Sequence, residues 1–183
     1  MKIRKDKGAI EYSMSIILLM ISVLLILFCF RIRSARVEKR YLEDALSSAN
    51  LAAAVIETDI YGETEKLIIS DTLGAYECFK RTLKTNLDLD DDFMPDDTFL
   101  MENPVEILEF HVYNVGEDMV THVIYDEYGS KSTEILSLSG LTTPDGTEVE
   151  STTIYSKIEF DVKGFLDQRN RLTLENSVDV VKN

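Results

Sequence analysis

The stretch YSMSIILLMISVLLILFCF, residues 12–30, runs for nineteen positions without a charge and decides the architecture of the chain. At about 1.5 Å per residue a helix of this length extends about 28 Å, close to the roughly 30 Å hydrocarbon core of a bilayer. A cleavable secretory signal has a shorter apolar region and then small residues at its cleavage site. Because Arg31, Arg33 and Arg36 follow here, we expect a membrane-spanning helix that is retained.

A short basic leader precedes this apolar stretch. It contains four cations and one acid, namely Lys2, Arg4, Lys5, Lys7 and Asp6. The residues Gly8-Ala9-Ile10-Glu11 join it to the apolar stretch, so Glu11 lies at the very start of the predicted span. A carboxylate costs about 2.5 to 3.5 kcal/mol at the centre of a spanning helix and less near the interface. Glu11 is therefore expected either to stay hydrated at the headgroup level, where it favours the helix N-terminus, or to have a partner.

The basic leader, the glycine, the sequence Ala9-Ile10-Glu11-Tyr12 and the long apolar run together resemble type IV pilin-like proteins. The resemblance is to the TadE-like minor pseudopilins of tight-adherence (Tad/Flp) pilus systems, and it covers about the first sixty residues. It implies cleavage by a prepilin peptidase between Gly8 and Ala9, which leaves a mature subunit that keeps its membrane helix. Glu11 would then be the glutamate typical of the family, at the third mature position rather than the usual fifth.

The resemblance also implies a structural role for Glu11 and a set of partners. Cleavage creates an α-amino group at Ala9, and this cation attracts the Glu11 carboxylate of a neighbouring subunit strongly in a low-dielectric setting. The implied partners are sister pilin-like subunits, the prepilin peptidase, an inner-membrane assembly platform and the lipid bilayer. The short N-terminus would be cytoplasmic and the C-terminal domain extracytoplasmic. The alternative is a single-pass, unprocessed anchor whose outer domain binds a ligand or stabilises a membrane complex.

The helical pattern continues beyond the apolar stretch, because neither Gly nor Pro occurs from Ala9 to Tyr61. Small and apolar residues recur there every three or four positions, at Val37, Tyr41, Ala45, Ala49, Ala52, Ile56 and Ile60. This spacing predicts one helix of about 50 residues with a single apolar stripe. We expect the stripe to pack against the protein's own distal domain, with packing against sister subunits as the alternative.

The charges are divided unevenly along the chain. Residues 1–40 contain nine Lys/Arg and three Asp/Glu, whereas residues 41–183 contain ten Lys/Arg and thirty Asp/Glu. A strongly acidic domain is not expected to bind nucleic acid, which is held by basic surfaces. Basic residues flank the span on both sides, so the charge distribution does not decide its orientation.

A second, shorter helix is predicted after Gly62, with Ser70 or Asp71 as its cap. Its apolar stripe comprises Leu73, Tyr76, Phe79, Leu83 and Leu87. The acidic stretch that follows is most simply a solvated loop. Asp88, Asp90 and Asp92 alternate like the first three calcium ligands of an EF-hand, but Phe93 and Phe99 stand where that loop needs Gly and Glu. These three aspartates are therefore only weak metal candidates.

From residue 104 onward the apolar residues alternate with polar ones, as in half-buried strands. Strands are expected at 105–113, 119–125, 133–138, 152–162 and 171–181, with a turn at Gly116-Glu117. The fold predicted from these patterns is α+β, with a long N-terminal helix and a four- or five-stranded antiparallel sheet packed on it. The expected order is a leader (1–8), a transmembrane helix (9–30), a helical stalk (31–61), the second helix with its acidic loop (62–103) and a β head domain (104–183).

The two histidines and two cysteines do not form a recognisable site. A hairpin centred between Gly116 and Glu117 would set His111 opposite His122, but zinc needs three or four protein ligands, so cross-strand packing is the expected role. Cys29 lies in the predicted span and Cys78 on the second predicted helix, at the other end of the stalk, so no disulfide between them is expected. No Ser/His/Asp grouping, phosphate-binding loop or nucleotide fingerprint occurs, so we expect neither enzymatic activity nor a cofactor.

Overall fold

The computed structural model describes residues 3–55, 61–62, 66–96, 101, 103–163 and 169–180, with backbone alone at 3–10, 35, 38 and 163. Two compact units divide at Tyr41/Leu42, and helix α1 (Ile3–Ala53) belongs partly to each. The described elements combine long helices with an antiparallel sheet, which confirms the α+β class predicted from the sequence.

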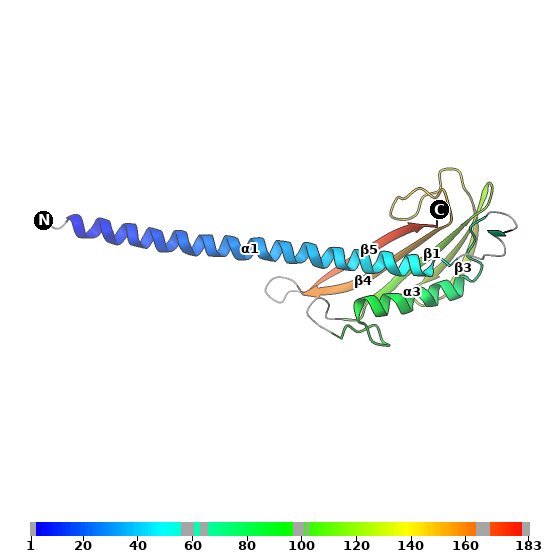
Figure 1. Cartoon of the computed structure of the whole chain (residues 1–183), viewed down its shortest axis with the longest axis horizontal. Helices are drawn as coiled ribbons and strands as arrows, with labels where there is room; N and C mark the ends of the chain where they lie inside the picture. The colour runs from blue at the N-terminus through cyan, green and yellow to red at the C-terminus, as the bar shows by residue number, and fades with distance from the viewer. Residues whose placement is uncertain are drawn as a thin grey trace. The chain divides into compact units, whose positions relative to one another are not determined.

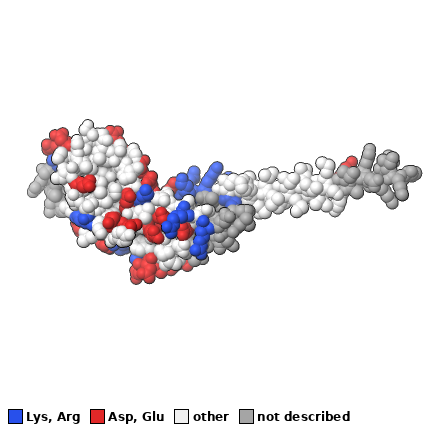
Figure 2. Space-filling view, turned by 180° about the vertical axis from the view of Figure 1, so that it is seen from behind, with Lys and Arg blue, Asp and Glu red and all other residues white. Residues whose placement is uncertain are grey.

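The first unit consists of α1 up to Tyr41. Straight-chain and apolar residues dominate this segment, and a helix satisfies their backbone groups internally. The described side chains from Glu11 to Arg33 are all exposed. Figure 2 shows a charge-free stretch of this helix that leads to a group of Lys and Arg side chains. These cations are Arg31, Arg33, Arg36, Lys39 and Arg40, and all five are exposed.

Helix α1 ends at Ala53, so the prediction that it extends to Tyr61 was wrong. The amide of Ala54 donates to the Leu51 carbonyl (3.2 Å), and the amide of Val55 donates to the Ala53 carbonyl (2.8 Å). These short-range bonds replace the helical pattern. Val55 is followed in the sequence by several β-branched residues, which lose side-chain freedom in a helix, so helix propensity falls here without any Gly or Pro.

The second unit is built on a five-stranded sheet in the order β3-β2-β1-β4-β5 (Figure 1). Its strands are β1 (Glu106–Val115), β2 (Met119–Asp126), β3 (Lys131–Ser137), β4 (Thr153–Lys163) and β5 (Arg169–Asp179). All four neighbouring pairs are antiparallel. The expected antiparallel sheet is thereby confirmed.

One face of the sheet carries the main hydrophobic core. Large apolar side chains alternate along the central strands, for example Phe110 and Val112 on β1 and Ile154 and Ile158 on β4. The same cluster contains Leu42, Ala45, Leu46, Ala49 and Ala53 from the last turns of α1. Ala45 and Ala49 are buried as predicted, whereas the predicted Val37 and Tyr41 are exposed. The buried stripe of α1 therefore begins only at Leu42.

Helix α3 (Thr72–Leu87) also contributes to this core. Asp71 is its N-cap and accepts a hydrogen bond from the Gly74 amide (2.8 Å). Tyr76, Phe79, Leu83 and Leu87 are buried as expected. The expected core position Leu73 is 56% exposed, because Thr72 and Ala75 take the inward positions of the first turn.

A smaller cluster lies on the opposite face of the sheet. It comprises Tyr113, Val120, Val149 and Tyr155, with Leu138 and Leu141 packed against it. Three of these residues, Leu138, Leu141 and Val149, come from the segment between β3 and β4. This long connection therefore covers part of the second face of the sheet.

Candidate functional site

The strongest candidate site is the N-terminal segment of α1 around Glu11. Among the described helices, the segment of α1 from Glu11 to Ala53 is long and apolar enough, by length and composition, to cross a membrane. Glu11 itself is exposed, and the hydroxyl of Ser15 donates to its backbone carbonyl (2.9 Å). The hydroxyl of Ser22 donates to the Leu18 carbonyl in the same way (2.9 Å). Both hydroxyls thus donate to backbone carbonyls of their own helix. The Ser15 hydroxyl is therefore not a donor to the Glu11 carboxylate.

Gly8 and Ala9, the residues of the predicted processing site, lie within the helical backbone of α1. Their side-chain environments are outside the described part of the chain. The predicted scissile bond therefore lies less than one turn before Glu11 on the same helix, and the cleavage itself remains a prediction.

His111 and His122 lie on the second face of the sheet, but they are not directly opposite each other. The register pairs His111 with Ile124 and Tyr113 with His122, so the two histidines are diagonal neighbours. The expected register was wrong because the amide of Gly116 bonds to the Met119 carbonyl (2.8 Å), which puts Glu117 and Asp118 in the turn. The rings still touch, with centroids 4.9 Å apart.

Burial lowers the pKa of both histidines. For His111, burial and the nearby His122 lower the pKa to about 4. For His122, burial lowers the pKa and outweighs the opposing influence of Glu134. The His111 Nδ1 atom lies 3.2 Å from the Tyr113 hydroxyl, whose own pKa is raised to about 12 by burial and by Asp145 and Glu109. At neutral pH the pair is uncharged and acts as packing between aromatic rings.

The acidic loop after α3 is ordered by its own hydrogen bonds. The Asp90 carboxylate accepts from the amides of Asp92 (2.8 Å) and Met94 (2.9 Å), and Asp88 adopts a left-handed conformation as the C-cap of α3. Among the residues that the structure describes, no three His, Cys, Asp or Glu side chains are grouped so that they could hold a metal ion. Of the weak candidates Asp88, Asp90 and Asp92, the first two thus have local structural roles here, and Asp92 takes part through its backbone amide.

A polar network that the sequence did not indicate joins the β3–β4 connection to β5. Asp145 accepts hydrogen bonds from the hydroxyls of Thr143 and Ser177 and from the amide of Thr147 (3.1 Å). Burial alone would raise the pKa of Asp145, but these hydrogen bonds hold it below its ordinary value. Ser177 is thirty-two positions from Asp145 in the chain, so only the fold could reveal this contact.

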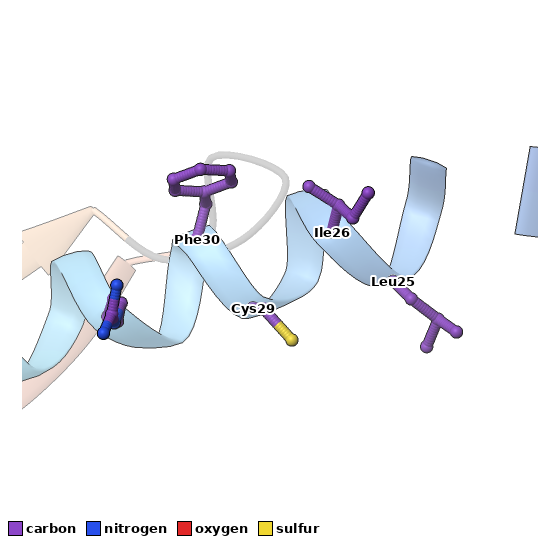
Figure 3. A pocket seen from close by; sticks show the side chains of 5 residues that line it. Leu25, Ile26, Cys29 and Phe30 are labelled. Carbon is purple, nitrogen blue, oxygen red and sulfur yellow. The ribbon is translucent and has the colours of Figure 1, made fainter. Parts of the chain in front are cut away.

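The hollows on the described surface include one on each unit. A groove of about 500 Å³ is bordered by Tyr76, Phe93 and Tyr128 together with carboxylates, but lysines from α3 already cover two of its rings: Lys80 lies over Tyr76 and Lys84 over Phe93. The second hollow, of about 300 Å³, lies on α1 and is lined by Leu25, Ile26, Cys29, Phe30 and Arg33 (Figure 3). In this view Ile26 and Phe30 project from one side of the helix, and Leu25 and Cys29 from the other.

Comparison with known proteins adds no relative. No family model, no curated protein and no solved structure matches the chain. Its function has to be argued from the residues and from the geometry described above.

Proposed function

We propose that this chain is a pilin-like, TadE-like structural subunit of a type IV or Tad-like pilus or secretion apparatus. In this role α1 anchors the subunit in the membrane, with the basic leader in the cytoplasm and the acidic α+β unit outside. The observation that carries the proposal is the position of Glu11, a carboxylate at the start of a long apolar helix and two residues after the Gly8-Ala9 pair. A plain membrane anchor accounts for a hydrated Glu11 at the headgroup level, but it gives no reason for the whole run Gly8-Ala9-Ile10-Glu11 between a basic leader and the apolar stretch.

The structure is compatible with this role in two respects. Helix α1 is continuous from Ile3 to Ala53, so the apolar segment and the first buried residues of the folded unit belong to one helix. The apolar side chains from Tyr12 to Phe30 are exposed within the chain, which leaves them available to lipid or to neighbouring subunits. Because lipid tails are as apolar as these side chains, assembly would need helix contacts that replace lipid contacts and an external motor.

The proposed role of Glu11 is to pair with the α-amino group of Ala9 in a neighbouring subunit. Each group alone is costly in a low-dielectric setting, whereas the pair attracts strongly. Such a pair would form only in one axial register of neighbouring helices. The carboxylate would therefore select the register in which subunits are added.

The N-terminus of the native protein tests the proposal directly. Mass spectrometry of the protein from cell envelopes is expected to find a chain that begins at Ala9. A chain that still begins at Met1, in cells with an active prepilin peptidase, would contradict the pilin-like role. The protein would then be a single-pass, unprocessed anchor with an outer binding or complex-stabilising domain.

The charge pairing has a separate test in the variant Glu11→Gln. We expect normal membrane insertion and at least a tenfold lower incorporation into filaments, measured by quantitative immunoblotting of sheared filaments. Asp6→Asn is the matched control, since it neutralises a carboxylate that cleavage would remove, and it should incorporate normally. Equal incorporation of Glu11→Gln and the wild-type chain would refute the pairing and leave the N-terminal test unaffected.

A further inference from the structure

The hollow on α1 leads directly into the group of cations that follows the apolar stretch. Cys29 is a free cysteine, and its small side chain leaves a depression between the larger Leu25, Ile26 and Phe30. The fifth lining residue is Arg33, so an apolar groove ends at a guanidinium group. A ligand that fits such a groove needs a long apolar chain with an anionic group at its end, and a phospholipid has both.

Further arginines extend the basic end of this groove along one face of the helix. Residues three or four positions apart lie on the same face, which places Arg36 and Arg40 in line with Cys29 and Arg33. All three arginines are exposed, and the acidic residue within 31–40 is Glu38. An arginine guanidinium binds phosphate oxygens with two parallel hydrogen bonds.

We propose that this face of α1 binds an anionic phospholipid. One acyl chain lies in the groove along Leu25, Cys29 and Phe30, and the phosphate contacts Arg33, with Arg36 and Arg40 selecting a headgroup of net negative charge. The inference rests only on the membrane placement within the proposed function. It does not depend on cleavage at Gly8 or on filament assembly.

A second copy of α1 is the competing occupant of the groove, and the charges argue against it. Two subunits inserted in the same direction would bring Arg33, Arg36 and Arg40 of both copies together if they packed through this face. Like charges at close range repel, most strongly where water is scarce. An anionic lipid instead neutralises the same three side chains.

The test uses the full-length protein in phosphatidylcholine vesicles that contain a trace of spin-labelled lipid. The labelled lipid is either phosphatidylglycerol or phosphatidylcholine, and electron paramagnetic resonance measures the motionally restricted fraction of each. We expect about fivefold preference for phosphatidylglycerol, weakening in high salt. The triple variant Arg33→Gln/Arg36→Gln/Arg40→Gln should lose this preference. Lys80→Gln/Lys84→Gln/Lys157→Gln, which removes the same charge from the folded unit, should keep it.

A second variant tests the groove itself. Cys29→Phe fills the depression and should reduce the restricted phosphatidylglycerol fraction at least twofold without a charge change. If the wild-type chain restricts both lipids equally, or if the triple variant keeps the preference, the lipid site is refuted. If Cys29→Phe instead abolishes cross-linking between copies and leaves the lipid preference intact, the groove is a helix–helix contact. If alkaline carbonate extracts the wild-type chain from the vesicles, the membrane placement fails as well.

Discussion

The imidazole rings of His111 and His122 meet edge to face, with an interplanar angle of 64° between them. Tyr113 stacks on His122 with ring centroids 4.2 Å apart, and both ring nitrogens of His122 are buried without a hydrogen-bond partner in the described part of the chain. Two imidazoles that touch in this way cannot both be charged without strong repulsion. The fold therefore holds a pair of titratable groups in the neutral form.

This pair predicts that the folded unit loses stability in mild acid. A lowered pKa means that the folded state binds fewer protons than the unfolded state, so the stabilisation is complete above about pH 6.5 and is lost as the pH falls toward 4. For His111 alone the loss is about 3 kcal/mol, because its pKa falls from 6.5 to about 4. Urea unfolding of the protein at pH 7.0 and 4.5, followed by circular dichroism, measures it.

The double variant His111→Phe/His122→Phe is the control for this pH dependence. Phenylalanine keeps the aromatic packing and cannot take a proton, so the free energy of unfolding should change much less between pH 7.0 and 4.5. The carboxylates with lowered pKa values, Asp145 and Asp161, contribute stability that is lost only below their ordinary value of 3.8, outside this interval. An unchanged pH slope in the double variant would show that other groups cause it.

Two leucines of α3 provide a matched pair for the core. Leu83 is fully buried against the sheet, whereas Leu73 on the same helix is 56% exposed. Leu83→Ala should lower the free energy of unfolding by about 2 to 5 kcal/mol, because it removes buried methyl groups and leaves a cavity. Leu73→Ala should change it by less than about 1 kcal/mol. Equal effects in denaturant titrations would contradict the assigned inward face of α3.

The first turn of α3 explains the glycine at position 74. Asp71 caps the helix through the Gly74 amide, and a Cβ atom at position 74 would meet the Asp71 carboxylate. Asp71→Ala should cost about 1 kcal/mol. Gly74→Ala usually stabilises a helix by a similar amount, but here it should do so only when Asp71 is already replaced. A double-mutant cycle of thermal unfolding would show this coupling, and additive effects would refute the clash.

Asn50 is a polar anchor between the last turns of α1 and β5. Its side chain is fully buried and its Nδ2 group donates to the Asn176 carbonyl (3.0 Å). Asn50→Ala leaves that carbonyl without its donor and should cost about 1 to 3 kcal/mol. Ser48→Ala, on the exposed side of the same turn, should cost less than about 0.5 kcal/mol. The two variants can be compared by chemical denaturation, and a cost for Asn50→Ala as small as that for Ser48→Ala would show that the contact contributes little.

The sequence predicted the helices and strands that depend on residues close together in the chain. The apolar run, the period of three to four in α3 and the alternation in the five strands each depend on residues close together in the chain. The helix, the sheet and most of the α3 core were therefore predicted close to their observed positions. The candidate site at Gly8, Ala9 and Glu11 came instead from the resemblance of the N-terminal residues to pilin-like proteins, and it stays a prediction.

The sequence-based prediction failed mainly where contacts between residues far apart in the chain decide the structure. The exposure of Leu73 and the diagonal placement of His111 and His122 depend on what packs against each segment. The end of α1 at Ala53 was missed for another reason, because the β-branched residues that follow it were not weighed. A shift of two residues in a hairpin register changes which side chains face each other but hardly changes the sequence pattern. The contact of Asp145 with Ser177 likewise has no local signal.

By itself the sequence determined that this chain has one apolar helix of membrane-spanning length, a carboxylate at its start and an acidic α+β domain after it. These properties follow from the order of polar and apolar side chains along the backbone. Only the tertiary structure decided which face of α1 is buried, how the two imidazoles touch and where the groove beside Arg33 lies. Those features arise from close packing and hydrogen bonding in three dimensions, which a one-dimensional pattern does not contain.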